Sequence, residues 1–309
     1  MSDMKCGYTY YLNENGGYRD DTIIGKKNAE DFFNVCNAGS QTTKVLAWIG
    51  QFVEIFKEMT GEPLEFKDWT LETTMFAVQG PNYKVILDNL GVPDTGRWRM
   101  VEAEVAGCKC LFTGTGYIGE NGFEVVIFDS DLANPEKGIK VWNAILEAGK
   151  EVGIALCGLG ARDILRLEAG LPLYGEDIHE DVNPYEAAFG FPAFCKIDKE
   201  PFFFGKAAVT KAKQEGVKIM HVCIKLKEKG IPRAGYDILN KSGEKIGHMV
   251  NGGRSPTIGN IGIGMGFVDI EYSKPSTEVL IQIRKKQILA EVVQMPFYDM
   301  KKWGWKREA

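Results

Sequence analysis

The stretch Gly158-Leu159-Gly160-Ala161-Arg162-Asp163-Ile164-Leu165-Arg166-Leu167-Glu168-Ala169 restricts the fold more than any other part of the chain. Its opening Gly-x-Gly is similar to the start of a dinucleotide-binding loop, but the third glycine is missing and no long apolar strand precedes it. A Rossmann fold is therefore disfavoured. The sequence instead predicts a helix from Ala161 to Ala169. Arg162 falls in its first turn, where a fixed guanidinium can bind a carboxylate through two hydrogen bonds.

The rest of the chain predicts a mixture of helices and strands, with a change of pattern near residue 215. Strands are expected at residues 6–13, 31–37 (buried), 75–78 and in pairs within 98–127, and helices at 45–56, 80–89 and 141–149. From Ile219 to Tyr298, short β-rich runs alternate with turns, which is typical of a small all-β barrel or sandwich. The alternate glycines at 262, 264 and 266 indicate close packing of the backbone in that region. The chain is therefore predicted to be α+β, with an all-β C-terminal domain.

Composition excludes several classes of function. The 309 residues carry a net charge of −5, which disfavours general binding to nucleic acid or to membrane surfaces. The first residues lack the basic segment and apolar run of a secretory signal, and no apolar stretch is long enough to span a bilayer. A cytoplasmic location is expected. Seven cysteines without framework spacing and only three histidines make a metal site improbable.

Asp20 and Asp21 are candidates for a chemical role. They follow the turn at Gly16-Gly17 and lead into Thr22-Ile23-Ile24, so this segment reads as a strand. Neighbouring residues of a strand point to opposite faces, and one of the two carboxylates is therefore expected to face inward. A carboxylate removed from water needs a partner or a function. The alternative is a pair of solvated acids after a hairpin turn.

Two further segments have both a structural and a functional interpretation. The glycine-rich stretch from Thr115 to Gly122 could be only a tight turn, but it places Glu124 at the entrance of the apolar strand 125–128. Leu173-Tyr174-Gly175-Glu176-Asp177 reads, on composition alone, as an acidic loop.

The order of these motifs resembles the glycine-cleavage T-protein family (aminomethyltransferases). The motifs run in the order Gly-Gly-x-x-Asp-Asp, Thr-Gly-Tyr-x-Gly-Glu-x-Gly-Phe-Glu, Gly-Leu-Gly-Ala-Arg-Asp-x-x-Arg-Leu-Glu-Ala, Leu-Tyr-Gly-x-Asp and Asn-Pro-x-Glu. Phe204-Gly205-Lys206 and Met295-Pro296-Phe297-Tyr298 continue the match, so the resemblance covers nearly the whole chain. The family's opening segment, which precedes the strand around Tyr8, has no counterpart, and the chain is expected to be shortened at its N-terminus.

The resemblance implies a multi-domain, cloverleaf-like α+β fold around a central folate pocket, with a C-terminal β-barrel. The implied domains are a partial folate-binding domain at 1–70, a second α+β folate-binding domain at 71–215 and the barrel at 216–309. The implied activity belongs to one-carbon metabolism and glycine catabolism. A one-carbon unit passes from the aminomethyl-lipoyl arm of the H-protein to tetrahydrofolate, and ammonia is released.

The resemblance also implies roles for individual residues. Asp21 matches the family's acid beside the reacting folate nitrogens and is the catalytic candidate. Glu124 matches the residue that reads the pterin edge, and Arg162 the arginine at the folate site. The other implied folate-binding residues are Tyr8, Asn37, Tyr117 and Lys302.

Departures from the family pattern keep two alternatives open. Gly114 stands where T-proteins commonly have an arginine, Ile118 replaces a threonine, and Asn121 replaces an aspartate. The folate-facing residues are retained better than those that would meet the donor. One alternative is a tetrahydrofolate-dependent demethylase acting on a small methylated donor. The other is a folate-binding regulatory or repair relative without transferase activity.

Overall fold

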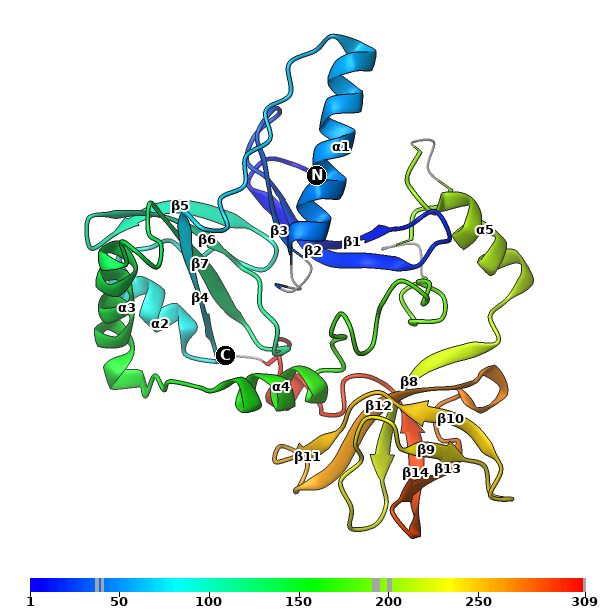
Figure 1. Cartoon of the computed structure of the whole chain (residues 1–309). Coiled ribbons are helices and arrows are strands. Elements are labelled where there is room, and N and C mark those ends of the chain that lie inside the picture. The colour runs from blue at the N-terminus through cyan, green and yellow to red at the C-terminus, as the bar shows by residue number, and fades with distance from the viewer. Residues whose placement is uncertain (37–38, 40–41, 191–194, 199–201, 308–309) are drawn as a thin grey trace. The chain divides into compact units, whose positions relative to one another are not determined.

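The computed structural model describes residues 1–36, 39, 42–190, 195–198 and 202–307. The chain groups into two compact units, and Figure 1 labels their helices and strands. Unit 1 comprises Met1–Thr9, Thr22–Gly116 and Glu120–Leu156, and unit 2 comprises Tyr10–Asp21, Tyr117–Gly119 and Cys157–Ala309. The division into three domains at residues 70 and 215 stays a prediction.

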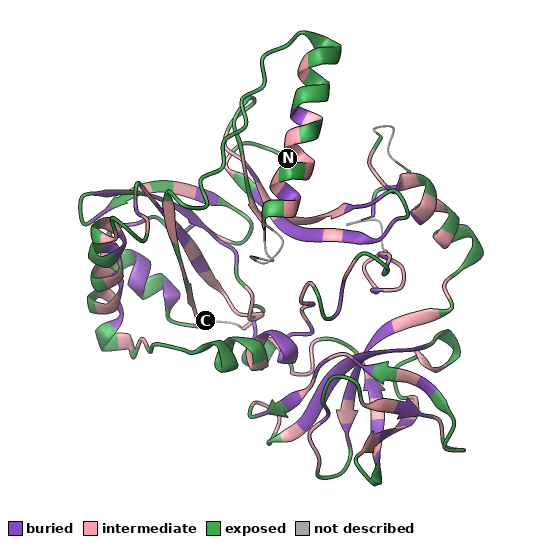
Figure 2. Ribbon diagram, viewed as in Figure 1, coloured by how far each residue is buried: buried purple, intermediate pink, exposed green. Residues whose placement is uncertain are grey.

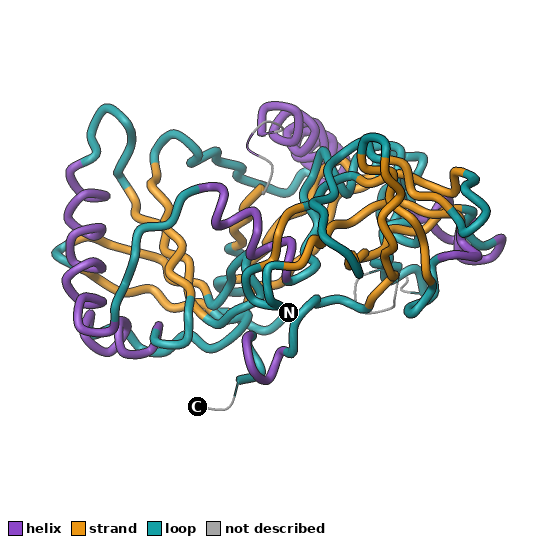
Figure 3. Tube along the Cα trace, turned by 90° about the horizontal axis from the view of Figure 1, so that it is seen from below, coloured by secondary structure: helices purple, strands orange, loops and turns teal. Residues whose placement is uncertain are grey.

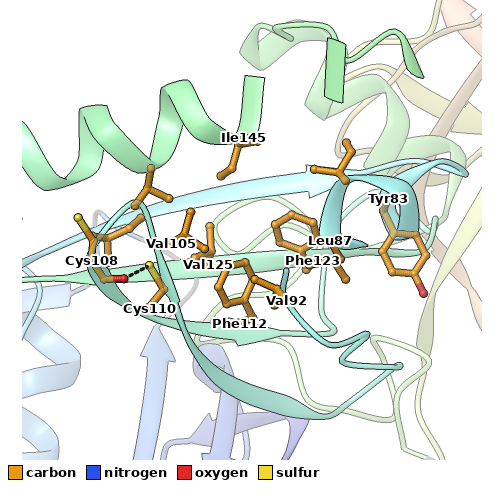
Figure 4. Packing of buried hydrophobic residues seen from close by; sticks show 13 residues of the cluster. Tyr83, Leu87, Val92, Val105, Cys108, Cys110, Phe112, Phe123, Val125 and Ile145 are labelled. Carbon is orange, nitrogen blue, oxygen red and sulfur yellow. Dashed lines mark hydrogen bonds between the residues drawn. The ribbon is translucent and has the colours of Figure 1, made fainter. Parts of the chain in front are cut away.

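The larger sheet of unit 1 is antiparallel, with the strand order β4-β7-β6-β5. Its strands are β4 (Thr73–Gln79), β5 (Met100–Val105), β6 (Cys108–Thr113) and β7 (Gly122–Phe128), and the helices α2 (Tyr83–Leu90) and α3 (Glu136–Gly149) pack with it. Alternate residues of β7, including Phe123 and Val125, point into a core that also contains Leu87 and Ile145 of the helices (Figure 4). Figure 3 shows α3 running alongside these strands. The period-two burial of β7 follows from one face of the sheet being covered by helices.

A smaller sheet has the strand order β1-β2-β3, with β1 at Lys5–Leu12, β2 at Tyr18–Lys26 and β3 at Phe32–Cys36. Strands β1 and β2 run through both units. The expectation that the strand near residues 31–37 is buried is wrong. Phe32 and Asn34 are exposed, because β3 is the edge strand of its sheet and its outer side has no neighbouring strand there.

Helix α1 (Thr42–Thr60) forms where apolar residues recur at helical spacing, but it is poorly covered. Its buried residues are Val45 and Val53, and Figure 2 shows most of the helix as exposed or half-buried. In the part of the chain that is described, no helix is long and apolar enough to cross a membrane.

The all-β part of unit 2 is a closed barrel. Its strands are β8 (Ile219–Leu226), β9 (Asp237–Leu239), β10 (Lys245–Met249), β11 (Gly253–Ser255), β12 (Ile261–Asp269), β13 (Glu278–Ile283) and β14 (Lys286–Val293). They pair in the order β10-β9-β13-β14-β8-β12, and β10 pairs with β12 to close a ring of six, while β11 adds to β12. Closure decides between the barrel and the sandwich and confirms the α+β prediction.

The predicted close packing at the alternate glycines is also confirmed. A Cβ atom added at Gly262, Gly264 or Gly266 of β12 would lie 2.5–2.6 Å from a backbone carbonyl oxygen. Larger residues are therefore excluded at this point of the barrel. Unit 2 also contains α4 (Leu159–Glu168), which begins two residues before its predicted start, α5 (Lys206–Glu215) and α6 (Met300–Trp303).

Candidate functional site

The two acids of β2 are both buried, which confirms the expectation that one of them faces inward and makes the alternative of a solvated pair wrong. Asp20 is fully buried and Asp21 is 3% exposed. One Asp20 carboxylate oxygen accepts a hydrogen bond from the Asp21 backbone N–H at 2.9 Å. Asp21 contributes, after burial and Cys195, to raising the pKa of Tyr18 well above its ordinary value.

Tyr117 and Arg162 are brought together in unit 2. The Arg162 guanidinium lies over the Tyr117 ring, 4.5 Å from its centroid, which is a cation–π geometry. Arg162 is exposed, and as the fourth residue of α4 it lies in the first turn of the helix, as predicted. The Tyr117 hydroxyl donates a hydrogen bond to the carbonyl oxygen of Pro172 at 2.5 Å.

The electrostatics of Tyr117 place Asp21 in the same neighbourhood. Burial raises the pKa of Tyr117 above its ordinary value, Arg166 and Arg162 oppose the rise, and Asp177 and Asp21 add to it. Tyr117 therefore interacts electrostatically with both Asp21 and Arg162, two other residues selected from the sequence.

A buried ionic network lies beside this group. The guanidinium of Arg166, which is 1% exposed, donates to Asp163 at 2.9 Å, to Glu176 at 3.0 Å and to Asp177 at 2.9 Å. Asp177 also accepts hydrogen bonds from His221 of β8 at 2.8 Å and from the Asn251 side chain at 2.7 Å. The acidic loop predicted at residues 173–177 is thus, at Asp177, a fully buried ion-pair site.

The charge of Asp177 is maintained although the residue is buried. Burial opposes ionisation, but the hydrogen bond and the electrostatic interaction with His221, together with the positive charge of Arg166, outweigh it and hold the pKa of Asp177 below its ordinary value. Buried carboxylates need such partners to remain charged.

Glu124 lies in unit 1, as the third residue of β7. Its carboxylate accepts a hydrogen bond from the Thr115 hydroxyl, and the hydroxyls of Thr113 and Thr115 are 2.6 Å apart. Burial and then the charge of Glu124 raise the pKa of Cys6 in β1 to about 12. The carboxylate is therefore held by the Thr115 hydroxyl in the turn after β6, and that hydroxyl is in turn hydrogen-bonded to the Thr113 hydroxyl of β6.

Three predicted site residues remain: Tyr8, Lys302 and Asn37. Tyr8 is half-buried in β1 of unit 1. Lys302 is exposed on α6, where its ammonium lies over the Trp303 ring at 5.0 Å from the centroid. Asn37 lies outside the described residues. Among the described residues, no three His, Cys, Asp or Glu side chains are close enough to hold a metal ion together.

Several residues of the site were not selected from the sequence. The Tyr298 hydroxyl donates a hydrogen bond to the Gly119 carbonyl oxygen at 3.3 Å, and the backbone N–H of Trp305 donates to the same oxygen at 3.1 Å. The C-terminal segment therefore packs on the 117–119 turn. Tyr298 closes the quoted Met-Pro-Phe-Tyr motif, which was an available signal. For Arg166 the sequence signal was weaker: this residue follows Asp163 by three positions and Arg162 by four on the same predicted helix, so the three side chains lie on one face.

Comparisons with known proteins match nearly the whole chain. A family model described as the GCVT N-terminal domain matches residues 1–199, and the glycine cleavage T-protein C-terminal barrel domain matches residues 220–299. A probable aminomethyltransferase of Pyrococcus horikoshii is 39% identical over 97% of this chain and 79% of its own length. The aminomethyltransferase of Bacillus subtilis is 37% identical over 95% of this chain and 77% of its own length.

The fold matches a solved structure as well. The crystal structure of glycine cleavage system aminomethyltransferase T from Bartonella henselae superposes with a TM-score of 0.79 and 28% sequence identity. The match covers 96% of this chain and 77% of that one.

Proposed function

Because the chain belongs to the glycine-cleavage T-protein family, we propose that it is a tetrahydrofolate-dependent aminomethyltransferase of the glycine cleavage system. Its donor would be the aminomethyl group on the lipoyl arm of the H-protein. Tetrahydrofolate supplies the nitrogen nucleophiles that accept the one-carbon unit. Ammonia and the dihydrolipoyl form of the H-protein are the other products.

The observation that carries the proposal is the grouping of Asp21, Tyr117 and Arg162 in unit 2. Arg162 is exposed and its guanidinium lies over the Tyr117 ring, so its N–H donors are accessible to an anion from the solvent. The carboxylates of a folate are suited to these donors, because guanidinium and carboxylate pair through parallel hydrogen bonds.

The other residues fit the same ligand chemically. The fixed carboxylate of Glu124 can accept hydrogen bonds from the N–H donors of a pterin ring. Asp21 is buried and its charge acts on Tyr117, which suits a group that holds or moves a proton near a reacting nitrogen. Tyr8 and Lys302 are assigned to folate binding only through their positions in the family motifs.

The alternatives identified from the sequence are less well supported. The curated relatives that match over nearly the whole chain are named aminomethyltransferases, which disfavours both a demethylase and a folate-binding protein without activity. The retained Asp21 also favours an enzyme over a binding protein.

Calorimetric titration with tetrahydrofolate tests the proposal, with saturable binding as the expected result. Glu124→Gln and Arg162→Ala should each weaken binding, while Lys211→Ala, an exposed lysine on α5, is the matched control and should leave it unchanged. Lipoylated, aminomethylated H-protein is then supplied as donor beside a panel of small methylated amines. A folded chain that does not bind tetrahydrofolate at millimolar concentration refutes the proposal. Turnover with a methylated amine, and none with H-protein, would establish the demethylase instead.

A further inference from the structure

We propose that Arg166 and Asp177 are positioning residues that hold Tyr117, and through it Arg162, in the geometry required for folate binding. This inference rests on the proposed function, since it assigns a task to a buried ion pair that lies outside the predicted folate contacts. All the residues involved belong to unit 2.

The ion pair holds the backbone that carries the Tyr117 acceptor. Arg166 donates to the carbonyl oxygen of Leu171 at 3.3 Å, and Asp177 accepts from the backbone N–H of Leu173 at 2.9 Å. The same guanidinium nitrogen and the same carboxylate oxygen are joined to each other at 2.9 Å. Residues 171 and 173 are therefore both tied to one ion pair, and Pro172 between them cannot shift without breaking it.

Pro172 passes this constraint to Tyr117. Its carbonyl oxygen accepts the Tyr117 hydroxyl hydrogen bond at 2.5 Å, and that hydrogen bond fixes the tilt of the phenol ring. Arg162 rests on the same ring at 4.5 Å from its centroid. A displaced Pro172 carbonyl would therefore move the ring and the guanidinium together.

The ionised form of Asp177 is needed for this arrangement. Its four partners, Arg166, Leu173 N–H, His221 and Asn251, all donate hydrogen bonds to it. An asparagine would present an NH₂ group to one pair of donors and would lose two of the four contacts. His221 and Asn251 come from the barrel domain. The network therefore also connects the barrel to residues 171–173, which carry the hydrogen-bond acceptor of Tyr117.

Glu168 offers a matched control for plain loss of stability. It is also 1% exposed and lies on α4, but it accepts its hydrogen bonds from Ser255 and Thr257 and not from residues 171–173. Glu168→Gln should lower the melting temperature, as Asp177→Asn does, without acting through Tyr117.

The first measurement does not depend on folate. In full-length protein with ¹³C-labelled tyrosine rings, the Tyr117 signal is assigned by its loss in Tyr117→Phe. Asp177→Asn should shift or broaden that signal, and Glu168→Gln should leave it in place. An unchanged Tyr117 signal in folded Asp177→Asn overturns the inference whatever the protein binds. Should Asp177→Asn not fold, Arg166→Lys, which keeps the positive charge but not the fork of donors, takes its place with the same two outcomes.

The second measurement is a double-mutant cycle on tetrahydrofolate affinity. Asp177→Asn should raise the Kd about tenfold in the wild-type background and less than twofold in a Tyr117→Phe background, because the route through the hydroxyl is already lost. Glu168→Gln should have the same effect in both backgrounds. Equal effects of Asp177→Asn in both backgrounds would reduce the ion pair to a structural role. A wild-type chain that fails to bind tetrahydrofolate would refute the proposed function and leave the ring measurement to decide the inference.

Discussion

Asp21 is the residue on which the proposed chemistry depends most directly. Asp21→Asn keeps the size of the side chain but removes its charge and basicity. If the carboxylate moves a proton or stabilises charge at the reacting nitrogen, kcat should fall by about 10²–10⁴-fold. The tetrahydrofolate Kd should change much less, because Arg162 and Tyr117 are unaltered. Steady-state kinetics and calorimetry on the same preparation measure the two effects.

Asp20→Asn is the matched control, since Asp20 is the adjacent buried carboxylate of β2. It should affect stability, because its carboxylate accepts the Asp21 N–H, and affect kcat less than Asp21→Asn does. Full turnover in Asp21→Asn would remove that residue from the mechanism. A large loss in Asp20→Asn alone would transfer the role to its neighbour.

Arg162 should act on binding and not on the chemical step. Arg162→Ala should weaken tetrahydrofolate binding by roughly 1.5–3 kcal/mol, the range for a lost hydrogen bond to a charged group. Arg162→Lys keeps the charge but loses the planar stacking and the fork of donors, so its affinity should lie between those of the wild type and Arg162→Ala. Equal affinities of the two variants would show that charge alone matters, and an unchanged Kd in both would exclude Arg162 from the site.

For single residues, the sequence predicted where a residue lies in a helix or strand better than it predicted the burial and the hydrogen-bond partners of its side chain. Residues such as Arg162 and Glu124 could be placed on a helix turn and at a strand entrance, because local periodicity sets both. The burial of both β2 acids and the fourfold coordination of Asp177 could not be predicted. Two of the hydrogen bonds to Asp177 come from His221 and Asn251, which are 44 and 74 positions away from it along the chain.

Among the elements, α1 and the segment after it expose several large apolar side chains in unit 1. The exposed large apolar side chains between residues 55 and 71 are Ile55, Phe56, Met59, Leu64, Phe66, Trp69 and Leu71. The helical period was predicted correctly, but the period alone does not show whether a partner covers the apolar face. Large exposed apolar patches favour association.

We expect this surface to cause self-association of the chain. Met59 is 82% exposed and Leu71 is 79% exposed, so Met59→Lys with Leu71→Lys should reduce association while stability changes by no more than about 0.5 kcal/mol per site. Sedimentation velocity and thermal melts provide the two measurements. Leu132→Lys, at an isolated position that is 98% exposed, is the control and should have no effect. A monomeric wild type, or equal association in all variants, would contradict this expectation.

The departure from the family pattern at Gly114 has a local cause in unit 1. A Cβ at this position would lie 1.8 Å from the Gly96 carbonyl oxygen, so no larger side chain fits while the backbone around Gly96 approaches so closely. The sequence identifies the departure but not its cause, since the two glycines are distant in the chain.

For the whole molecule, the order of the motifs along the chain predicted the family and its fold, whereas no single motif was sufficient to do so. The all-β character of residues 219–298 was evident from the sequence, whereas the pairing of β10 with β12 that closes the barrel was not. Closure depends on the register between Met249 and Gly266, which the alternate glycines permit but do not specify.

Acid stability of the barrel provides the last prediction. Glu278 on β13 is hydrogen-bonded to Lys227 at 2.7 Å and paired with Lys241 at 2.6 Å, and these lysines lower its pKa from the ordinary 4.5 to about 2. A carboxylate whose pKa is lowered by folding stabilises the folded state above pH 4.5, and this contribution is lost as the pH falls from 4.5 to 2. Glu278→Gln should therefore lower the Tm by about 1–3 °C at pH 6 and by progressively less as the pH falls through that window.

Circular dichroism melts between pH 2 and pH 7 measure this difference, and 0.5 M salt should shrink it because the pairs are near the surface. Glu271→Gln, an exposed glutamate that takes part in none of the described ion pairs, is the matched control. Its Tm should follow that of the wild type at every pH. A gap between wild type and Glu278→Gln that stays constant from pH 6 to pH 2 would show that the side chain acts through packing and that its two lysines do not stabilise the barrel electrostatically.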